Sequence, residues 1–94
     1  MNGELVDWAD ATVHVGVHGL HYGTGVFEGI RAYETPDGPA VFRLTEHIQR
    51  LFNSAKIVGM EIPYTVEELV AATKQTVAST GLRQPIEVWA LSQP

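Results

Sequence analysis

The sequence has no cysteine among its 94 residues. A disulfide framework and a metal site built on thiolates are therefore both excluded. Basic residues are also few, with six Lys and Arg against eleven Asp and Glu and a formal net charge of -5. Because nucleic-acid binding depends on clustered Lys and Arg, we do not expect nucleic acid as a partner.

Long hydrophobic runs are missing as well. No window approaches the roughly 18 consecutive apolar residues of a membrane span, so no membrane partner is expected. The first ten residues contain three acidic side chains and no apolar segment. We therefore expect no signal peptide and a cytoplasmic location. Hydrophobic residues still make up 45% of the chain, which is enough for the core of one modest globular domain.

The central stretch, residues 18–33, has a glycine-rich first half and a second half that predicts a strand. Glycine allows positive φ or a close approach of the backbone to another surface. Side chains alternate between the two faces of a strand. The strand over 26–33 therefore has two faces, the first with Phe27, Gly29, Arg31 and Tyr33 and the second with Val26, Glu28, Ile30 and Ala32.

The first of these faces has the character of a small-molecule site. A glycine inside a strand often marks a place where a ligand or another backbone comes close, which is what Gly29 suggests. Arg31 offers a planar fork of donors that suits a carboxylate or a phosphate. The alternative is a sheet edge on which Arg31 is solvated and Gly29 marks a bulge.

A turn is predicted at residues 35–39, where Pro, Asp and Gly follow one another. The segment 40–42 would then return as a partner strand, so that the two strands form a hairpin. Further short strands are expected at Gly3–Trp8, after a turn at Asn2, and at Thr12–Val15.

Two amphipathic helices follow the hairpin. The first is expected to begin at Thr45 as N-cap and to end before Gly59, and its apolar stripe consists of Ile48, Leu51, Phe52 and Ala55. The second begins with a capping box of Thr65 and Glu68 and ends at Gly81. Its stripe consists of Val66, Leu69, Val70, Thr73 and Val77. A last strand is expected over residues 85–91.

The elements together predict an α+β fold, in which a small antiparallel sheet with a β-hairpin is covered by two helices. His14 and His18 are four residues apart, a spacing that on a helix would suggest paired metal ligands. The β-branched and glycine residues around them argue against a helix there. We therefore expect no metal site and expect these histidines to form hydrogen bonds within a loop.

The thirteen residues from His21 to Tyr33, HYGTGVFEGIRAY, resemble the signature of branched-chain amino-acid aminotransferases. These are fold-type IV pyridoxal-phosphate enzymes, and the likeness runs from Asn2 to about Leu82. It implies that the parent protein exchanges an amino group between leucine, isoleucine or valine and 2-oxoglutarate. It also implies pyridoxal 5'-phosphate as cofactor, a role in amino-acid metabolism, and a homo-oligomer, most simply a dimer.

The resemblance also implies roles for individual residues. Tyr22, Phe27, Gly29 and Arg31 would line the substrate side, and Tyr22 would reach the active site of the neighbouring subunit. Arg50 would bind the cofactor phosphate, for which a bidentate guanidinium is well suited. At 100° per residue Arg50 lies about 160° from the centre of its helix's apolar stripe. The alternative to a phosphate ligand is therefore an arginine that is simply exposed to solvent.

The family's catalytic lysine has no counterpart here. The two lysines of the chain, Lys56 and Lys74, fall within the predicted helices and are expected to be surface charges. We therefore expect this chain alone to be inactive and to bind no cofactor. Residues 1–84 would be the small N-terminal domain. Residues 85–94 would be its terminal strand or a tail foreign to the family, because the family's Tyr-Ile-Arg-Pro pattern is not found there.

Two other functions remain open. The isolated chain could be a non-catalytic folding or dimerisation module. Its parent could instead be a D-amino-acid aminotransferase or an aminodeoxychorismate lyase of the same fold type, although the run Phe27 to Tyr33 favours the branched-chain enzymes. Absorbance separates the module from an enzyme, because a lysine-bound pyridoxal phosphate colours a protein yellow.

Overall fold

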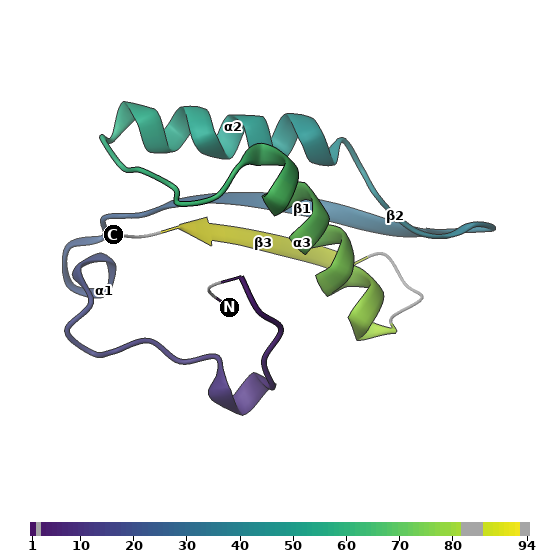
Figure 1. Cartoon of the computed structure of the whole chain (residues 1–94), viewed down its shortest axis with the longest axis horizontal. Helices are drawn as coiled ribbons and strands as arrows, with labels where there is room; N and C mark the ends of the chain where they lie inside the picture. The colour runs from purple at the N-terminus through teal and green to yellow at the C-terminus, as the bar shows by residue number, and fades with distance from the viewer. Residues whose placement is uncertain (2, 82–85, 93–94) are drawn as a thin grey trace.

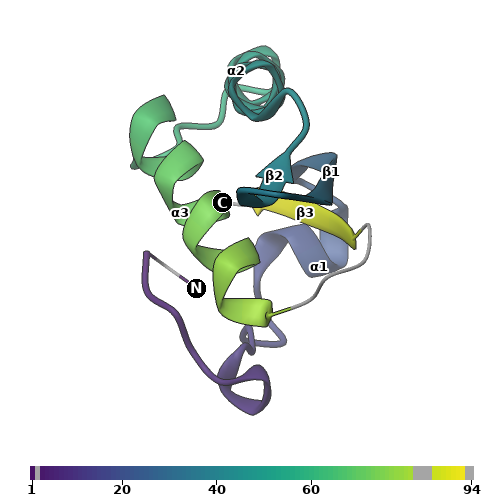
Figure 2. The same ribbon diagram turned by 90° about the vertical axis from the view of Figure 1, so that its right-hand side faces the viewer.

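Two helices cover one face of a three-stranded antiparallel sheet in the computed structural model of the chain (Figures 1 and 2). The structure describes residues 1, 3–81 and 86–92, the last range by its backbone. The strands are β1 (Val26–Thr35), β2 (Gly38–Val41) and β3 (Ile86–Ser92), in the order β2-β1-β3. This arrangement confirms the predicted α+β fold and the last strand, apart from Pro85, which lies outside the described residues.

The predicted hairpin is formed by β1 and β2, with Pro36 and Asp37 as its turn. The Thr35 hydroxyl accepts a hydrogen bond from the Asp37 N–H at 3.3 Å and donates one to the Gly38 carbonyl at 2.6 Å. Gly38 has a φ of 107°, which only glycine adopts easily. The return strand therefore begins at Gly38, two residues before the predicted start, and ends at Val41.

The central strand β1 is paired along different lengths on its two sides. β3 pairs with it from Val26 to Ala32, whereas β2 pairs with it only from Ala32 to Thr35. Residues 26–30 therefore have β3 on one side and, among the described residues, no strand on the other. This edge lies within the segment that carries the candidate site.

The two helices are α2 (Leu44–Ile57) and α3 (Val66–Thr80). The prediction of Thr45 as N-cap is wrong, because α2 begins at Leu44 and follows Arg43, which has a φ of 49°. Leu44 is buried in the core, so burial of this apolar side chain places it inside the first turn. Thr65 caps α3 as predicted by accepting the Glu68 N–H at 3.1 Å.

The core forms where α2 and α3 meet β1. Val26 and Ile30 of β1 pack against α2 in two clusters that Leu69 of α3 also contacts. The apolar stripe of α2 is confirmed, with Ile48, Leu51 and Ala55 at most 2% exposed. The stripe of α3 is less deeply buried, and Val77 is its one buried residue among those described. Gly59 and Gly81 follow the helices with positive φ, as helix C-termini require.

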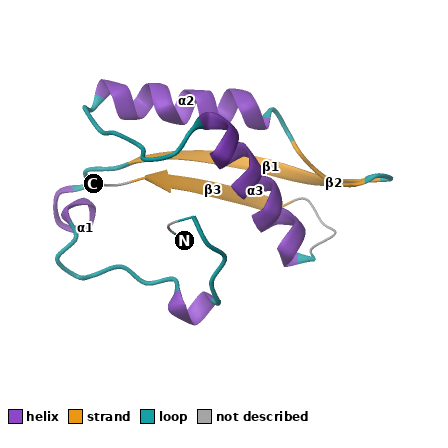
Figure 3. Cartoon of the chain, in the orientation of Figure 1, coloured by secondary structure: helices purple, strands orange, loops and turns teal. Residues whose placement is uncertain are grey.

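The strands predicted before β1 are wrong. Residues 3–25 instead contain a 3-10 turn, η1 (Trp8–Asp10), and a one-turn helix, α1 (His18–Tyr22), joined by loops on the side of the sheet away from α2 (Figure 3). Trp8 is 94% exposed, and Val13 and Val15 are also exposed. An alternating pattern produces a strand only where a partner strand and a buried face are available. No described strand lies beside this segment.

The helices of the described residues are all too short or too polar to cross a membrane.

The core predicts a strong contrast between two isoleucines of α2. Ile48 has no exposed surface, whereas Ile57 is 85% exposed. Replacing Ile48 by alanine should lower the free energy of unfolding by about 2–5 kcal/mol, because it removes buried methyl groups and leaves a cavity. Ile57→Ala is the matched control and should change it by no more than about 0.5 kcal/mol. Urea denaturation followed by circular dichroism measures both, and similar losses would contradict this core.

Candidate functional site

The predicted alternation along β1 is present in the structure. Val26, Glu28, Ile30 and Ala32 are buried beneath the helices, and Phe27, Gly29, Arg31 and Tyr33 are exposed on the other face. Among the side chains that the structure describes, Glu28 is the one charged residue that is buried, with 6% of its surface exposed. Because an ionised carboxylate in such a place must be paired, its partners define a site.

Glu28 is paired with two side chains of α2. Arg50 donates from Nε to Oε1 and from Nη2 to Oε2, both at 2.7 Å. His47 Nδ1 lies 2.9 Å from Oε2. This cluster of Glu28, His47 and Arg50 is called the Glu28 cluster below. The side-on bidentate contact is the strong form of an arginine–carboxylate pair.

The position of α2 over the sheet explains the cluster. The helix runs alongside β1 (Figure 1), and His47 and Arg50 are three residues apart, so they lie on neighbouring positions of one helix surface. The helical wheel placed Arg50 opposite the apolar stripe, as a solvated side chain or a phosphate ligand. The long side chain does both: 67% of it remains exposed to solvent, as the solvated alternative expects, and its guanidinium also reaches the buried carboxylate.

The pairing also shifts the protonation of its members. The hydrogen bond from Arg50 lowers the pKa of Glu28 below its usual value of 4.5, against the opposing effect of burial, and His47 adds to the lowering. The same hydrogen bond with Glu28 raises the pKa of Arg50. Glu28 is therefore ionised and Arg50 charged at neutral pH.

Arg50 keeps the capacity to bind an anion. A guanidinium has two bidentate edges, and Glu28 occupies the one formed by Nε and Nη2. The edge formed by Nη1 and the second hydrogen of Nη2 points away from that carboxylate. It suits a phosphate or a carboxylate, since either accepts two parallel hydrogen bonds.

Sequence reasoning missed Glu28 and His47 as members of this site. The signal for Glu28 was present, because a carboxylate between Val26 and Ile30 on the predicted buried face requires a partner. The signal for His47 was weaker, since its three-residue spacing from Arg50 becomes informative only when both side chains meet the same group.

The residues predicted for the substrate side lie apart from the Glu28 cluster. Phe27, Gly29 and Arg31 share the outer face of β1, and Phe27 is 62% exposed. Tyr22 ends α1, is 77% exposed and stacks on His18 with ring centres 4.6 Å apart. The β1–β3 register runs residue for residue through Gly29, so the alternative of a bulge there is wrong.

The histidines before β1 are arranged differently from a ligand pair. His14 Nδ1 accepts the Gly16 N–H at 2.9 Å, a loop hydrogen bond as predicted. His18 begins α1, so the prediction of a loop is wrong for His18, although residues 14–17 are not helical and the two histidines do not share a helix. Within the described residues no three His, Cys, Asp or Glu side chains gather closely enough to hold a metal ion. Lys56 and Lys74 are both exposed, as expected of surface charges.

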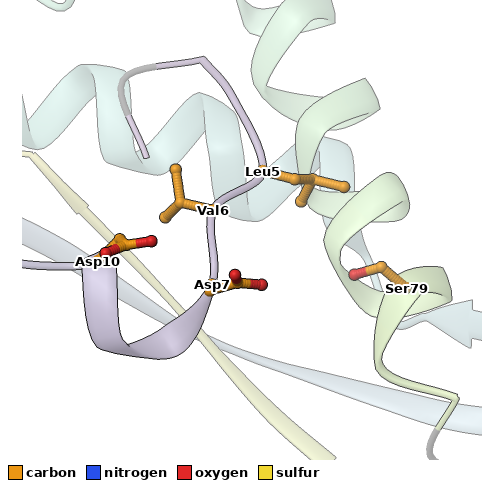
Figure 4. Close-up of a pocket in the computed structure, with 5 residues that line it drawn as sticks. All are labelled: Leu5, Val6, Asp7, Asp10 and Ser79. Atoms are coloured by element: carbon orange, nitrogen blue, oxygen red, sulfur yellow. The ribbon is translucent and has the colours of Figure 1, made fainter.

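An open pocket lies elsewhere, between the N-terminal segment and the end of α3 (Figure 4). Its lining consists of Leu5, Val6, Asp7, Asp10 and Ser79. None of these residues belongs to the Glu28 cluster or to the outer face of β1. The pocket therefore adds nothing to the candidate site.

Comparisons with known proteins point to one family. The family model described as amino-transferase class IV matches residues 25–93. Curated relatives include branched-chain-amino-acid aminotransferases of Pseudomonas aeruginosa, 57% identical over 81 residues, and of Escherichia coli K12, 51% identical over 81 residues. Each match covers 86% of this chain but 26% of the relative.

A solved structure agrees with these relatives. A branched-chain amino acid aminotransferase from T.th., complexed with N-(5'-phosphopyridoxyl)-L-glutamate, superposes with a TM-score of 0.93 at 50% identity. The match covers 99% of this chain and 31% of that one. The chain therefore spans between a quarter and a third of the proteins it resembles, and the predicted likeness to branched-chain aminotransferases is confirmed.

The Glu28 cluster predicts unequal effects of removing its members. Arg50→Ala leaves a buried carboxylate with His47 as its remaining partner, whereas Glu28→Gln removes the buried charge and frees an exposed guanidinium that water can solvate. Arg50→Ala should therefore lower the free energy of unfolding more than Glu28→Gln. Adding Glu28→Gln to Arg50→Ala should restore part of the loss in a double-mutant cycle. Additive effects would show that the two side chains are not coupled.

The lowered pKa of Glu28 predicts a dependence of stability on pH. A carboxyl group whose pKa is lowered in the folded state stabilises the fold above its ordinary value of 4.5, and this contribution disappears as the pH falls through the folded pKa. The stability difference between the wild type and Glu28→Gln should thus be largest at neutral pH and shrink in acid. Thermal unfolding at a series of pH values measures it. Glu46→Gln, an exposed change on the same helix, is the control, and a constant difference would contradict this role of Glu28.

Proposed function

This chain belongs to the class IV aminotransferase family, and we propose that it is the N-terminal part of a pyridoxal-phosphate-dependent branched-chain aminotransferase. The parent would exchange an amino group between leucine, isoleucine or valine and 2-oxoglutarate. Support comes from relatives of that name at 51–57% identity. The observation that carries the proposal is the Arg50 guanidinium, which is anchored on one edge and open on the other.

The proposed cofactor site fits the residues present. Arg50 would bind the phosphate of pyridoxal 5'-phosphate through its outer edge, because a dianionic phosphate accepts two parallel hydrogen bonds from a guanidinium. Pyridoxal phosphate, when bound, supplies the electron sink on which amino-group transfer depends. The T.th. relative was solved with a phosphopyridoxyl-glutamate compound, which supports both the cofactor and a glutamate-type amino donor.

The outer face of β1 would form part of the substrate side. Phe27 would be an apolar wall for branched side chains, and Gly29 would leave room beside it because it has no side chain. Arg31 would orient a neighbouring tyrosine or carboxylate. Tyr22, which projects from the end of α1, would reach the active site of a second subunit in a homo-oligomer. Association is also favoured by the exposed apolar side chains before β1.

Several further features belong to the same proposal. The lysine that forms the covalent bond to the cofactor and moves the substrate proton would lie outside this chain, since Lys56 and Lys74 match no family position. Residues 1–84 would be the small domain. Residues 85–94 would be its terminal strand, which the pairing of β3 with β1 and a family match reaching residue 93 support. A cytoplasmic location remains a prediction.

A chimeric enzyme tests this proposal. The 81 matched residues of this chain would replace their counterparts in the Pseudomonas aeruginosa relative. We expect the chimera to bind pyridoxal phosphate and to turn over leucine with 2-oxoglutarate. Arg50→Ala should weaken cofactor retention because the phosphate loses its bidentate partner, and Phe27→Ala should mainly change which side chains are accepted. Arg43→Ala is the matched control for Arg50. A folded chimera that retains its cofactor equally well without Arg50 would overturn the assignment.

The chain by itself should behave differently. We expect no transaminase activity and no stoichiometric borohydride-reducible adduct at a single lysine. One exposed charged contact contributes on the order of 1 kcal/mol or less, far below the roughly 8 kcal/mol of micromolar binding. Titration with pyridoxal phosphate, reduction and peptide mass mapping measure this. A stoichiometric adduct at Lys56 or Lys74 together with turnover of leucine would mean that the chain contains its own catalytic lysine.

A further inference from the structure

The buried carboxylate of Glu28 brings together three hydrogen-bonding nitrogens from one helix. Oε1 accepts Arg50 Nε, and Oε2 bonds both Arg50 Nη2 and His47 Nδ1, at distances of 2.7 to 2.9 Å. Glu28 itself lies on the central strand of the sheet and is 6% exposed. The guanidinium is therefore held from its inner edge by a group that the sheet keeps in place.

We propose that Glu28 is a positioning residue for an anion site at Arg50, whose ligand is a phosphate monoester. Its carboxylate fixes the Nε–Nη2 edge, so that the Nη1–Nη2 edge of the largely exposed arginine is presented to the phosphate in one orientation. The inference rests on the proposed function, because it takes Arg50 as the phosphate ligand. The inference adds Glu28 to that site, a residue for which neither the sequence analysis nor the proposed function gives a role.

His47 also contacts the carboxylate of Glu28, through its Nδ1. To bond a carboxylate, its Nδ1 must carry the proton, which leaves Nε2 as an acceptor when the ring is neutral. A neutral His47 therefore offers no donor to a phosphate through Nε2. It restrains the Glu28 carboxylate instead, since Oε2 is shared between His47 and Arg50.

Two physical effects of Glu28 on phosphate binding oppose each other. Without an anchor, the long arginine side chain samples many rotamers, and a guanidinium correctly placed only about a tenth to a third of the time binds about tenfold to threefold more weakly. The negative charge of Glu28 also repels a phosphate, and its removal would strengthen binding by about twofold to threefold at a solvated site. Positioning dominates only if Glu28→Gln weakens binding more than an equal loss of charge nearby.

Glu46→Gln supplies that matched charge change. Glu46 lies four residues before Arg50 on α2, is exposed, and has no bond to Arg50 among the described contacts. Both variants remove one negative charge from the neighbourhood of Arg50, but only Glu28→Gln breaks the bidentate contact, because glutamine has one acceptor oxygen in place of two. The ratio of their phosphate affinities therefore isolates positioning from charge.

The experiment uses the chimeric enzyme described above, labelled with ¹⁵N, freed of its cofactor and titrated with inorganic phosphate at constant ionic strength. The Arg50 Nε–H resonance, identified by its loss in Arg50→Lys, reports binding through its shift and anchoring through its rate of exchange with water. We expect Glu28→Gln to speed this exchange and to weaken phosphate binding about threefold to tenfold relative to Glu46→Gln. Glu28→Asp keeps the charge on a shorter stem and should restore part of both.

The other outcomes distinguish a failure of the positioning role of Glu28 from a failure of Arg50 as the phosphate ligand. Equal or tighter binding by Glu28→Gln than by Glu46→Gln overturns the positioning role and leaves Arg50 as the ligand. An Arg50 resonance that does not respond to phosphate in the otherwise unsubstituted chimera overturns the role of Arg50 and this inference together. If Glu28→Gln does not fold, Glu28→Asp and His47→Asn make the same comparison, and unchanged exchange and affinity in both would overturn the positioning role.

Discussion

A carboxylate on the buried face of a strand is the constraint on which much of this structure depends. Glu28 lies among apolar side chains of β1, where an unpaired charge would be strongly unfavourable. α2 supplies both partners, His47 and Arg50, from adjacent turns. The same contact therefore neutralises the buried charge, joins the helix to the central strand and gives the arginine a defined orientation.

The two-residue period of β1 divides the candidate site residues between two faces. One face contributes Val26 and Ile30 to the core and Glu28 to the cluster with Arg50, and the opposite face presents Phe27 and Arg31. A phosphate at Arg50 and a substrate side chain at Phe27 would thus meet different faces of one strand. The edge of β1 at residues 26–30, which no described strand covers, lies between them.

The sequence predicted correctly those features that depend on interactions between nearby residues, or on a helix face that is buried against other parts of this chain. The hairpin turn, the Thr65 cap and the apolar stripe of α2 were all predictable, because each depends on residues close in sequence or on helical periodicity. The strands expected before β1 were wrong. Their alternating apolar residues, such as Val13 and Val15, are exposed, and a pattern cannot show whether a partner strand exists.

The sequence by itself determined the fold class, the two faces of β1 and the family, because periodicity, turn chemistry and a thirteen-residue signature are properties of the linear chain. The tertiary structure alone decided what Arg50 contacts. Its partner Glu28 is 22 residues earlier in the chain, and helical periodicity describes only the direction in which the side chain leaves the helix axis. The distance between α2 and β1 sets whether that side chain meets water or a buried carboxylate, and this distance follows from packing of the whole core.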